Sequence, residues 1–482
     1  MRKSAILLFA LATAVAGPGV ATAEPRRDLD RARELIDDGF RALEAADTAT
    51  AEHRFELATR LSPDLAPAWL GLAECHRLQG DNLRALHAAR KAAEAAPGLA
   101  SASYAIARIL VELGSPSAAL DAAARARELD PGNVDIRLFE ALLLQQEGRS
   151  AEASERLGDA WDADLRDPRL AEELALLLVA SQQTERALEI VDASLNVAPA
   201  RPVLQFAKAL LLAEDIDRQG EAEDWFRRAL AAGIREPGRV HLELGRLLVE
   251  TGREQNAVEE LERARELLPQ SPEVQYHLAT AHRALGDSEQ AGLALQAFQR
   301  LNQETEASER RTRELGIALN EAQTLAQDNR LAESLKRVDE ILASYPEEPQ
   351  AFAIRAKVLF SMARRREALT AAVRARQLHP GRVEYHYLEG LFLMHSSRPA
   401  EAEVALLRAL TVEEDSAEVH ALLAGALVKQ ERPGEAVEHF QRALDLGREG
   451  ADLRLGYAGA LESLGRQQES ESQMEAYRAL PR

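Results

Sequence analysis

The chain has 482 residues, which is more than one ordinary globular domain, and 46% of them are hydrophobic while only 4% are aromatic. Alanine dominates the apolar residues, and its high helix propensity and small side chain favour close packing between helices. The formal net charge of −20 argues against nucleic-acid binding, because phosphate contacts depend on clustered Lys and Arg.

The first 23 residues have the three parts of a secretory signal peptide. Arg2 and Lys3 form a basic start, residues 5–16 are apolar, and an Ala-Thr-Ala sequence precedes the expected cleavage after Ala23. A membrane anchor is the weaker interpretation, because a spanning helix needs about 20 apolar residues. No cysteine follows the apolar run, so a lipoprotein anchor is unsupported. Cleavage changes the net charge to −20 − 2 = −22, and we predict a periplasmic or secreted protein without a further membrane span.

The single cysteine, Cys75, excludes an intrachain disulfide and any zinc or haem site that needs several cysteines. It lies in an apolar helical pattern, so we predict a small buried core residue and not a reactive thiol.

One stretch shows the unit that the rest of the chain repeats. Its first half places four residues on one face of a helix by the spacing i, i+3, i+4, i+7: Trp69, Leu72, Ala73 and His76. Its second half places three small residues on one face of a second helix by the spacing i, i+4, i+7: Ala85, Ala89 and Ala92. A Gly-Asp-Asn turn lies between the halves, and Pro97 ends the unit because it cannot continue a helix.

This pattern resembles the tetratricopeptide repeat, a 34-residue helix-turn-helix unit. Its small residue that opens the second helix recurs thirteen times, mostly at a spacing of 34: Ala51, Ala85, Ala119, Ala153, Ala187, Ala222, Ala257, Ala291, Ser334, Ala368, Ala402, Ala436 and Ser470. Twelve residues earlier lies a small first-helix residue, which is Gly or Ala in every repeat except the sixth, where it is Leu210. The resemblance implies an all-α solenoid of about thirteen repeats, wound into a right-handed superhelix.

The repeats also predict the domain organisation. Nine additional residues separate repeats eight and nine, and their charged composition without Gly or Pro predicts extra helix and not a flexible linker. We therefore expect a first array of eight repeats at residues 24–304, a helical insertion at 305–314, and a second array of five repeats at 315–482. Residues 24–29 carry no pattern and are expected to be disordered. Repeat four has Leu165 where the terminating proline would stand.

The chain contains no recognisable catalytic or cofactor motif. We find no phosphate-binding loop, dinucleotide fingerprint, nucleophile elbow or His-Glu-x-x-His zinc motif. Its carboxylate pairs are typical of solvated helix faces, and its eleven histidines are scattered along the repeats. We therefore predict no enzymatic activity, no cofactor and no metal site.

In the family that the repeats resemble, the first helices line a concave surface that binds protein partners. In that family the lining residues stand three residues before, one residue after and four residues after the small first-helix residue. The resemblance places eight candidate binding residues at these positions: Tyr104, Arg108, Tyr276, Arg283, Phe360, Tyr387, Leu391 and Met394. The apolar members suit an extended segment or an amphipathic helix, and Tyr and Arg are enriched at binding hot spots. The alternative is that these side chains only pack between neighbouring first helices. In cytosolic chaperone-binding members, an asparagine stands one residue after the small first-helix residue. None of the repeats in this chain has asparagine at that position.

These observations predict an extracytoplasmic scaffold that binds protein partners in its groove. A narrower version of this hypothesis, by analogy, is a subunit of an envelope assembly or export machine. The competing hypothesis is a carbohydrate-binding protein or an enzyme subunit with a site hidden in the groove, which predicts convergent polar groups and aromatic platforms there. A third possibility is self-assembly through exposed apolar ends.

Overall fold

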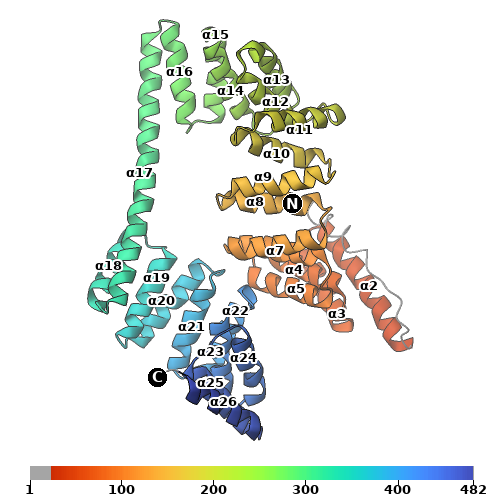
Figure 1. The fold of residues 1–482 in the computed structure, drawn as a ribbon, viewed down its shortest axis with the longest axis vertical. Helices are drawn as coiled ribbons and strands as arrows, with labels where there is room; N and C mark the ends of the chain where they lie inside the picture. Colours follow the sequence, from red (N-terminus) through yellow and green to blue (C-terminus); the bar gives the residue numbers. More distant parts are fainter. Residues whose placement is uncertain (1–22, 481–482) are drawn as a thin grey trace. The chain divides into compact units, whose positions relative to one another are not determined.

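The computed structural model describes residues 23–480, which form 25 α-helices, one 3-10 helix and no strand (Figure 1). The all-α repeat fold expected from the sequence is therefore confirmed for this part of the chain. The predicted signal peptide lies outside the described residues, except for Ala23, where the first helix begins.

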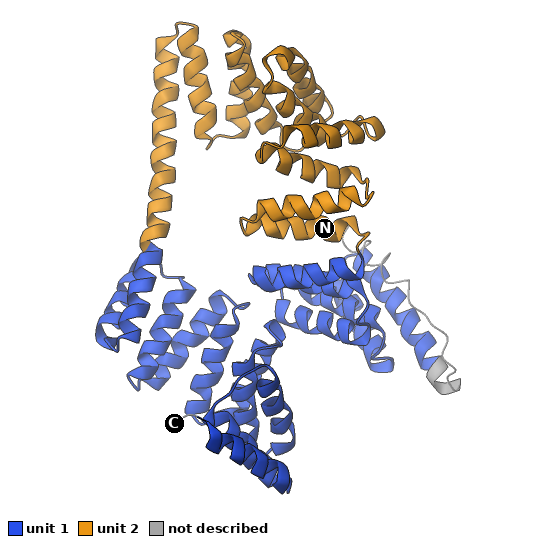
Figure 2. Cartoon of the chain, in the orientation of Figure 1, with its two compact units in different colours: residues 1–130, 315–482 blue, residues 131–314 orange. Residues whose placement is uncertain are grey.

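The chain divides into two compact units, which Figure 2 colours separately. Unit 1 combines residues 1–130 with residues 315–482, and unit 2 comprises residues 131–314. In terms of repeats, unit 1 holds the first three and the last five, while unit 2 holds repeats four to eight. The arrays of eight and five repeats describe the spacing of the repeats along the sequence. They remain a prediction, because the two compact units group the repeats by contact in space.

Most repeats in unit 1 are antiparallel pairs of helices of similar length. The helices are α2 (Ala23–Glu44), α3 (Thr48–Leu61), α4 (Ala66–Leu78), α5 (Asn82–Ala95), α6 (Ala100–Glu112), α7 (Pro116–Leu129), α18 (Leu331–Ser344), α19 (Pro349–Ser361), α20 (Arg365–Leu378), α21 (Val383–His395), α22 (Pro399–Val412), α23 (Ala417–Val428), α24 (Pro433–Asp445), α25 (Ala451–Ser463) and α26 (Gln467–Ala479). The helix α2 is longer, with 22 residues, and α18 pairs with the end of a longer helix, described below.

Unit 2 contains the same kind of helix pairs, with a short 3-10 turn in repeat six. Its helices are α8 (Val134–Gln146), α9 (Ser150–Asp162), α10 (Pro168–Ala180), α11 (Thr184–Val197), α12 (Pro202–Ala213), η1 (Ile216–Arg218), α13 (Gln219–Ala231), α14 (Pro237–Glu250), α15 (Glu254–Leu267) and α16 (Pro272–Ala284). One further helix, α17 (Ser288–Gln327), is 40 residues long. It joins the second helix of repeat eight, the charged insertion and the first helix of repeat nine without a break.

The N-terminal end of the repeats differs from the expectation. Residues 24–29 belong to α2, so the expected disordered lead-in is wrong. Only one helix breaker occurs there, Pro25, and it stands in the first turn, where a helix uses no backbone N–H. Nothing else in this stretch prevents the helix from extending toward Ala23.

The turn between the two helices of a repeat has a constant backbone geometry. Five residues before the small second-helix position, a residue adopts positive φ, as Gly80 does with φ 79°. The next amide, of Asp81, then bonds the carbonyl of His76 at 2.9 Å, and the Asp81 carboxylate accepts from the amide of Arg84 to cap α5. The equivalent positive-φ residues are Ala46, Gly114, Gly148, Gln182, Gly252, Gly286, Asn329, Ala363, Ser397, Glu431 and Gly465.

Repeat six departs from this geometry at its first turn, and repeat four differs from the other repeats at its end, in both cases where the sequence departs from the pattern. Repeat six has no positive-φ residue at its first turn, and Asp215 caps η1 there instead. Repeat four ends without proline, because Asp164 adopts φ 69° and the amide of Leu165 bonds the carbonyl of Ala160 at 3.0 Å. A residue in the left-handed backbone conformation thus follows the end of α9, where several other repeats have a proline.

Small residues allow the two helices of a repeat to approach closely. A methyl group built on Gly245 would lie 2.5 Å from the side chain of Leu261, and one on Gly390 would lie 2.7 Å from that of Leu406. Where serine replaces the usual alanine, its hydroxyl is satisfied, since Ser334 donates to the carbonyl of Ala322 at 2.7 Å. The family pattern of small residues therefore reflects backbone contact between paired helices.

A second interaction links five of the repeats to the one before. The Nε1 of Trp69 donates to the carbonyl of Pro63 at 2.7 Å, six residues earlier and just beyond the end of α3. Chemically different side chains make the same bond in other repeats: Arg137 to Pro131, Gln205 to Pro199, His386 to Pro380 and His420 to Glu414. In these repeats the side-chain N–H satisfies a carbonyl that follows a helix and has no backbone partner.

Unit 1 is also held together by contacts between repeats far apart in the sequence. The guanidinium of Arg90 on α5 donates to the carbonyls of Leu410 and Val412 at 3.0 and 3.1 Å, near the C-terminus of α22. The Ser115 hydroxyl donates to the carbonyl of Gly381 at 2.6 Å. These bonds satisfy carbonyls that a helix end or loop leaves open.

Cys75 is fully buried, as predicted. Burial raises the pKa of its thiol to about 12, and the charges of Glu52 and Glu74 act in the same direction, so the thiolate is disfavoured. No helix between residues 23 and 480 is long and apolar enough to cross a membrane.

Candidate functional site

The first pair of predicted binding residues, Tyr104 and Arg108, lies on α6 in unit 1. The Arg108 guanidinium lies 5.9 Å from the centre of the Tyr104 ring. On the neighbouring α4, burial acts to raise the pKa of Glu74, but its hydrogen bond with Arg77 and the charges of Arg77 and Arg108 outweigh burial and hold the pKa below its usual value. Arg77 also bonds Glu112 at 2.7 Å. This surface is therefore a network of paired charges beside one aromatic ring.

The second group lies on α19 and α21 of unit 1. Phe360 is half-buried and stacks on Phe392 with ring centres 4.6 Å apart. Tyr387 and Leu391 are also half-buried and pack against neighbouring clusters. Met394 is only 7% exposed and packs in the core with residues of α22 and α23, which corrects its assignment to a binding surface.

The third group, Tyr276 and Arg283, lies on α16 in unit 2. Tyr276 is 49% exposed and its ring lies 5.7 Å from that of Phe298, while Arg283 is exposed. The eight predicted residues thus fall on helices of both units and do not make up one site within a single unit.

A groove of about 480 Å³ lies on the first-helix face of unit 2, along α8, α10 and α12. Its apolar lining consists of Leu138, Leu142, Leu176, Val203, Phe206 and Ile234. Leu142 is 47% exposed, while Phe206 is buried and packs into the core beneath. The groove therefore offers exposed aliphatic side chains on a rigid helical base.

Several charged side chains on the rim of this groove are held by partners. Arg201 bonds both carboxylate oxygens of Glu172, at 2.8 and 2.6 Å. Arg169 bridges Asp135 and Asp167 at 2.7 and 3.1 Å. Such pairing orders one side of the rim, whereas the charged residues at the other side form no ion pair among the described residues: Arg235, Glu236 and Arg239.

The candidate residues chosen from the sequence do not include this groove, although its leucines stand at the concave positions that the family resemblance defines. Leu138 and Leu142 stand three residues before and one residue after the small first-helix residue of repeat four, and Glu172 and Leu176 do so in repeat five. The concave positions were defined correctly, but only aromatic and Arg residues were selected from most repeats. Leucine at these positions in two consecutive repeats was the signal that could have indicated the groove.

Within residues 23–480, no three His, Cys, Asp or Glu side chains are placed to hold a metal ion. The most closely placed histidines are His420 and His439, whose Nδ1 atoms lie 2.9 Å apart. The Nε2 of His420 donates to the carbonyl of Glu414, so the shared proton comes from His439. Both ring nitrogens of His420 are thus engaged in hydrogen bonds.

Stacked helix pairs with a groove on their first helices define a helical-repeat scaffold for protein interactions. Models of the tetratricopeptide repeat family match residues 292–482 and residues 39–100, 104–168 and 242–304. The chain therefore belongs to the tetratricopeptide repeat family, whose fold typically serves as a protein-binding scaffold without catalytic activity.

No curated protein sequence matches the chain. Among solved structures, MamA from Desulfovibrio magneticus RS-1 is 16% identical with a TM-score of 0.32, over 34% of this chain and 93% of that one. Yeast Tom70 is 16% identical with a TM-score of 0.28, over 92% and 96%. A tetratricopeptide repeat protein from Parabacteroides merdae is 16% identical with a TM-score of 0.38, over 52% and 99%. These low scores carry no argument about partners.

Proposed function

We propose that the protein binds an apolar segment of a partner protein in the first-helix groove of unit 2, and does so without catalytic chemistry of its own. The observation that carries this proposal is the groove of about 480 Å³ along α8, α10 and α12, with exposed leucine beside ordered ion pairs. An extended segment or an amphipathic helix can bury aliphatic side chains there, and each buried methylene contributes about 0.8 kcal/mol.

The groove favours a protein ligand over a glycan. Carbohydrate recognition would be expected to use exposed aromatic platforms inside the groove. Phe206 is the only aromatic residue among those lining it, and it is 4% exposed. The lining instead suits leucine-like side chains of a peptide.

Site-specific photo-crosslinking in living cells tests the groove. A photoreactive amino acid in place of Leu142 should give a discrete covalent adduct with a partner, because this side chain is the most exposed part of the apolar lining. The same group in place of Ile216, which is 82% exposed in the same unit but outside the groove, is the matched control. A Leu176→Glu change should remove the adduct at residue 142. Equal adducts at residues 142 and 216 would contradict the proposal.

The proposal places the mature protein outside the cytoplasm. It rests on the basic start, the short apolar run and the Ala-Thr-Ala sequence that precede Glu24. Mass spectrometry of the protein from its native host should find Glu24 as the first residue of the mature chain. A mature chain that retains the apolar run would contradict export by this route.

A further inference from the structure

Repeat ten has a charge opposite to that of the chain. Residues 349–382, which cover α19, α20 and the following turn, contain one carboxylate, Glu367, and eight cations, giving a net charge of +7 in a chain of −20. The cations are Arg355, Lys357, Arg364, Arg365, Arg366, Arg374, Arg376 and Arg382. Such a local reversal attracts anionic groups that the rest of the chain repels.

Neighbouring repeats neutralise only part of this charge. Arg355 lies 3.3 Å from Asp339, and Arg376 lies 2.6 Å from Glu389. Arg374 has only a long contact of 3.6 Å with Glu347. Other pairs are Lys357 with Glu384 and Arg364 with Glu367. Among the described residues, no carboxylate pairs with Arg366 on α20 or with Arg408 on the next second helix, α22.

A cavity of about 1000 Å³ lies between the second helices α20 and α22, beside these free cations. Its floor contains the buried Leu359 and Leu393 and the half-buried Leu369, and Val404 on its edge is 49% exposed. Arg374 and Arg408 line the cavity, and Arg366 lies outside the lining, about two turns before Arg374 on α20. The carboxylates that line it are all engaged: Glu367 with Arg364, Glu389 with Arg376 and Glu401 with Arg398.

We propose that this cavity is a second docking site, which binds a short acidic segment with interspersed apolar side chains from another protein. Guanidinium groups pair with carboxylates through two parallel hydrogen bonds. In the lining, Arg408 has no carboxylate partner among the described residues and Arg374 has only its long contact with Glu347, while the unpaired Arg366 lies nearby on α20. The aliphatic floor accepts the apolar side chains of the segment. This site lies on second helices, so it is independent of the first-helix groove and does not rest on the function proposed there.

The charge of the remaining chain favours a short peptide over a long polyanion. Outside residues 349–382 the net charge is −20 − 7 = −27. A nucleic acid that extended beyond the cavity would meet this acidic surface and be repelled. An acidic peptide that fits within the cavity meets only the local positive charge.

Fluorescence anisotropy with a defined probe tests the site on the full mature chain. The probe is a short fluorescein-labelled peptide in which glutamate alternates with leucine, and its control carries lysine in place of glutamate. The unmodified protein should bind only the glutamate peptide. The combined change Arg366→Glu, Arg374→Glu and Arg408→Glu should raise Kd by about tenfold or more, because each change replaces an attraction to glutamate by a repulsion.

A matched variant separates the site from overall charge. Arg60→Glu, Arg84→Glu and Arg300→Glu together make the same charge change at exposed arginines elsewhere, and should leave Kd within about twofold. Far-UV circular dichroism checks that both triple variants are folded, and a triple Arg→Gln variant at the cavity serves if the reversal unfolds repeat ten. An equal rise in Kd for the cavity variant and for the matched variant would overturn the proposal.

Two further results would also overturn it. Binding to phosphatidylglycerol vesicles without binding to the glutamate peptide would assign the cations to lipid headgroups. A dimer in sedimentation velocity that the cavity variant converts to a monomer would make a second copy of this chain the occupant. Binding of the peptide by a monomer, with loss only in the cavity variant, supports the site.

Discussion

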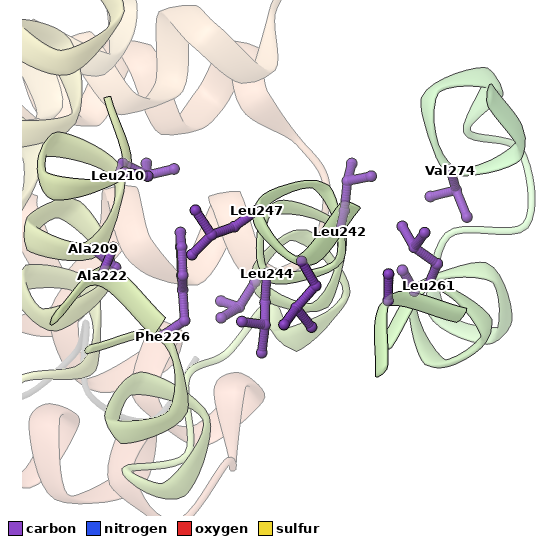
Figure 3. Close-up of a cluster of buried hydrophobic side chains, with 14 of the residues drawn as sticks. Ala209, Leu210, Ala222, Phe226, Leu242, Leu244, Leu247, Leu261 and Val274 are labelled. Atoms are coloured by element: carbon purple, nitrogen blue, oxygen red, sulfur yellow. The ribbon is translucent and has the colours of Figure 1, made fainter. Parts of the chain in front are cut away.

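Replacing Phe226 with alanine is expected to lower the free energy of opening of repeats six and seven by about 3–5 kcal/mol. Phe226 is fully buried on α13 and belongs to the cluster that joins α12 to α14, with Leu210, Leu244 and Leu247 around it (Figure 3). Removing the ring leaves a cavity between helices that cannot close without shifting a whole repeat. Hydrogen exchange read on peptides of α12–α14 measures the effect, because a repeat protein opens locally.

A leucine at the equivalent register position provides the control. Leu295 stands four residues after Ala291, as Phe226 does after Ala222, but it is 46% exposed. Leu295→Ala should therefore cost less than about 1 kcal/mol in the same measurement. A similar cost for both changes would show that register position, and not burial, sets the stability of a repeat.

The unfolding free energy of the repeats around His386 is expected to fall by up to about 3 kcal/mol as the pH drops from 6.5 to 4. His386 is fully buried on α21, and its Nε2 donates to the carbonyl of Pro380 at 2.7 Å. Burial lowers its pKa to about 4; the nearby Arg376 and Arg408 also lower the pKa, and the bond to Pro380 only partly opposes them. The folded repeat therefore holds a neutral imidazole.

The sign follows from proton binding in the two states. Above pH 6.5 neither state holds the extra proton. Between pH 6.5 and 4 the unfolded chain binds it and the folded chain does not, so stability decreases as the pH falls and levels off below about 4. Urea denaturation at several pH values, combined with hydrogen exchange on α21, measures this slope.

A His386→Gln variant isolates the contribution of this residue. Gln205 makes the equivalent bond to Pro199 at 2.7 Å, so glutamine can keep the donor without a titrating group. Between pH 6.5 and 4, the unfolding free energy of the variant should change less with pH than that of the unmodified protein. Some slope will remain, because burial also lowers the pKa of His420 and of His439. An unchanged slope would mean that His386 does not stay neutral in the fold.

The periodic small residues were sufficient to predict the fold, because each repeat depends on contacts within about one unit of sequence. Ala51, Ala85 and Ala119 are fully buried at their helix crossings, as their spacing indicates. The positive-φ residue of each turn was harder to predict. Glycine marks it in several repeats, but Gln182 and Glu431 occupy it in others, where local packing imposes a geometry that their side chains do not favour.

The candidate sites could be predicted only in part. The positional rule for first helices includes Leu142 and Leu176, which line the groove of unit 2, but also Met394, which the next repeat buries. Whether a large side chain at such a position lies open depends on the side chains of the adjacent repeat. The basic cavity was hidden by the acidic total charge, because its cations gather from α19, α20 and α22.

The sequence by itself therefore determined the helix pairs and the family, since these follow from local spacing and from contacts between consecutive helices. The tertiary structure alone decided which repeats make up a compact unit. It brings Arg90 to the carbonyls of Leu410 and Val412, more than 300 residues away, and leaves Arg366 and Arg408 without carboxylate partners among the described residues. Such contacts depend on the accumulated rotation of many repeats, which no single repeat encodes.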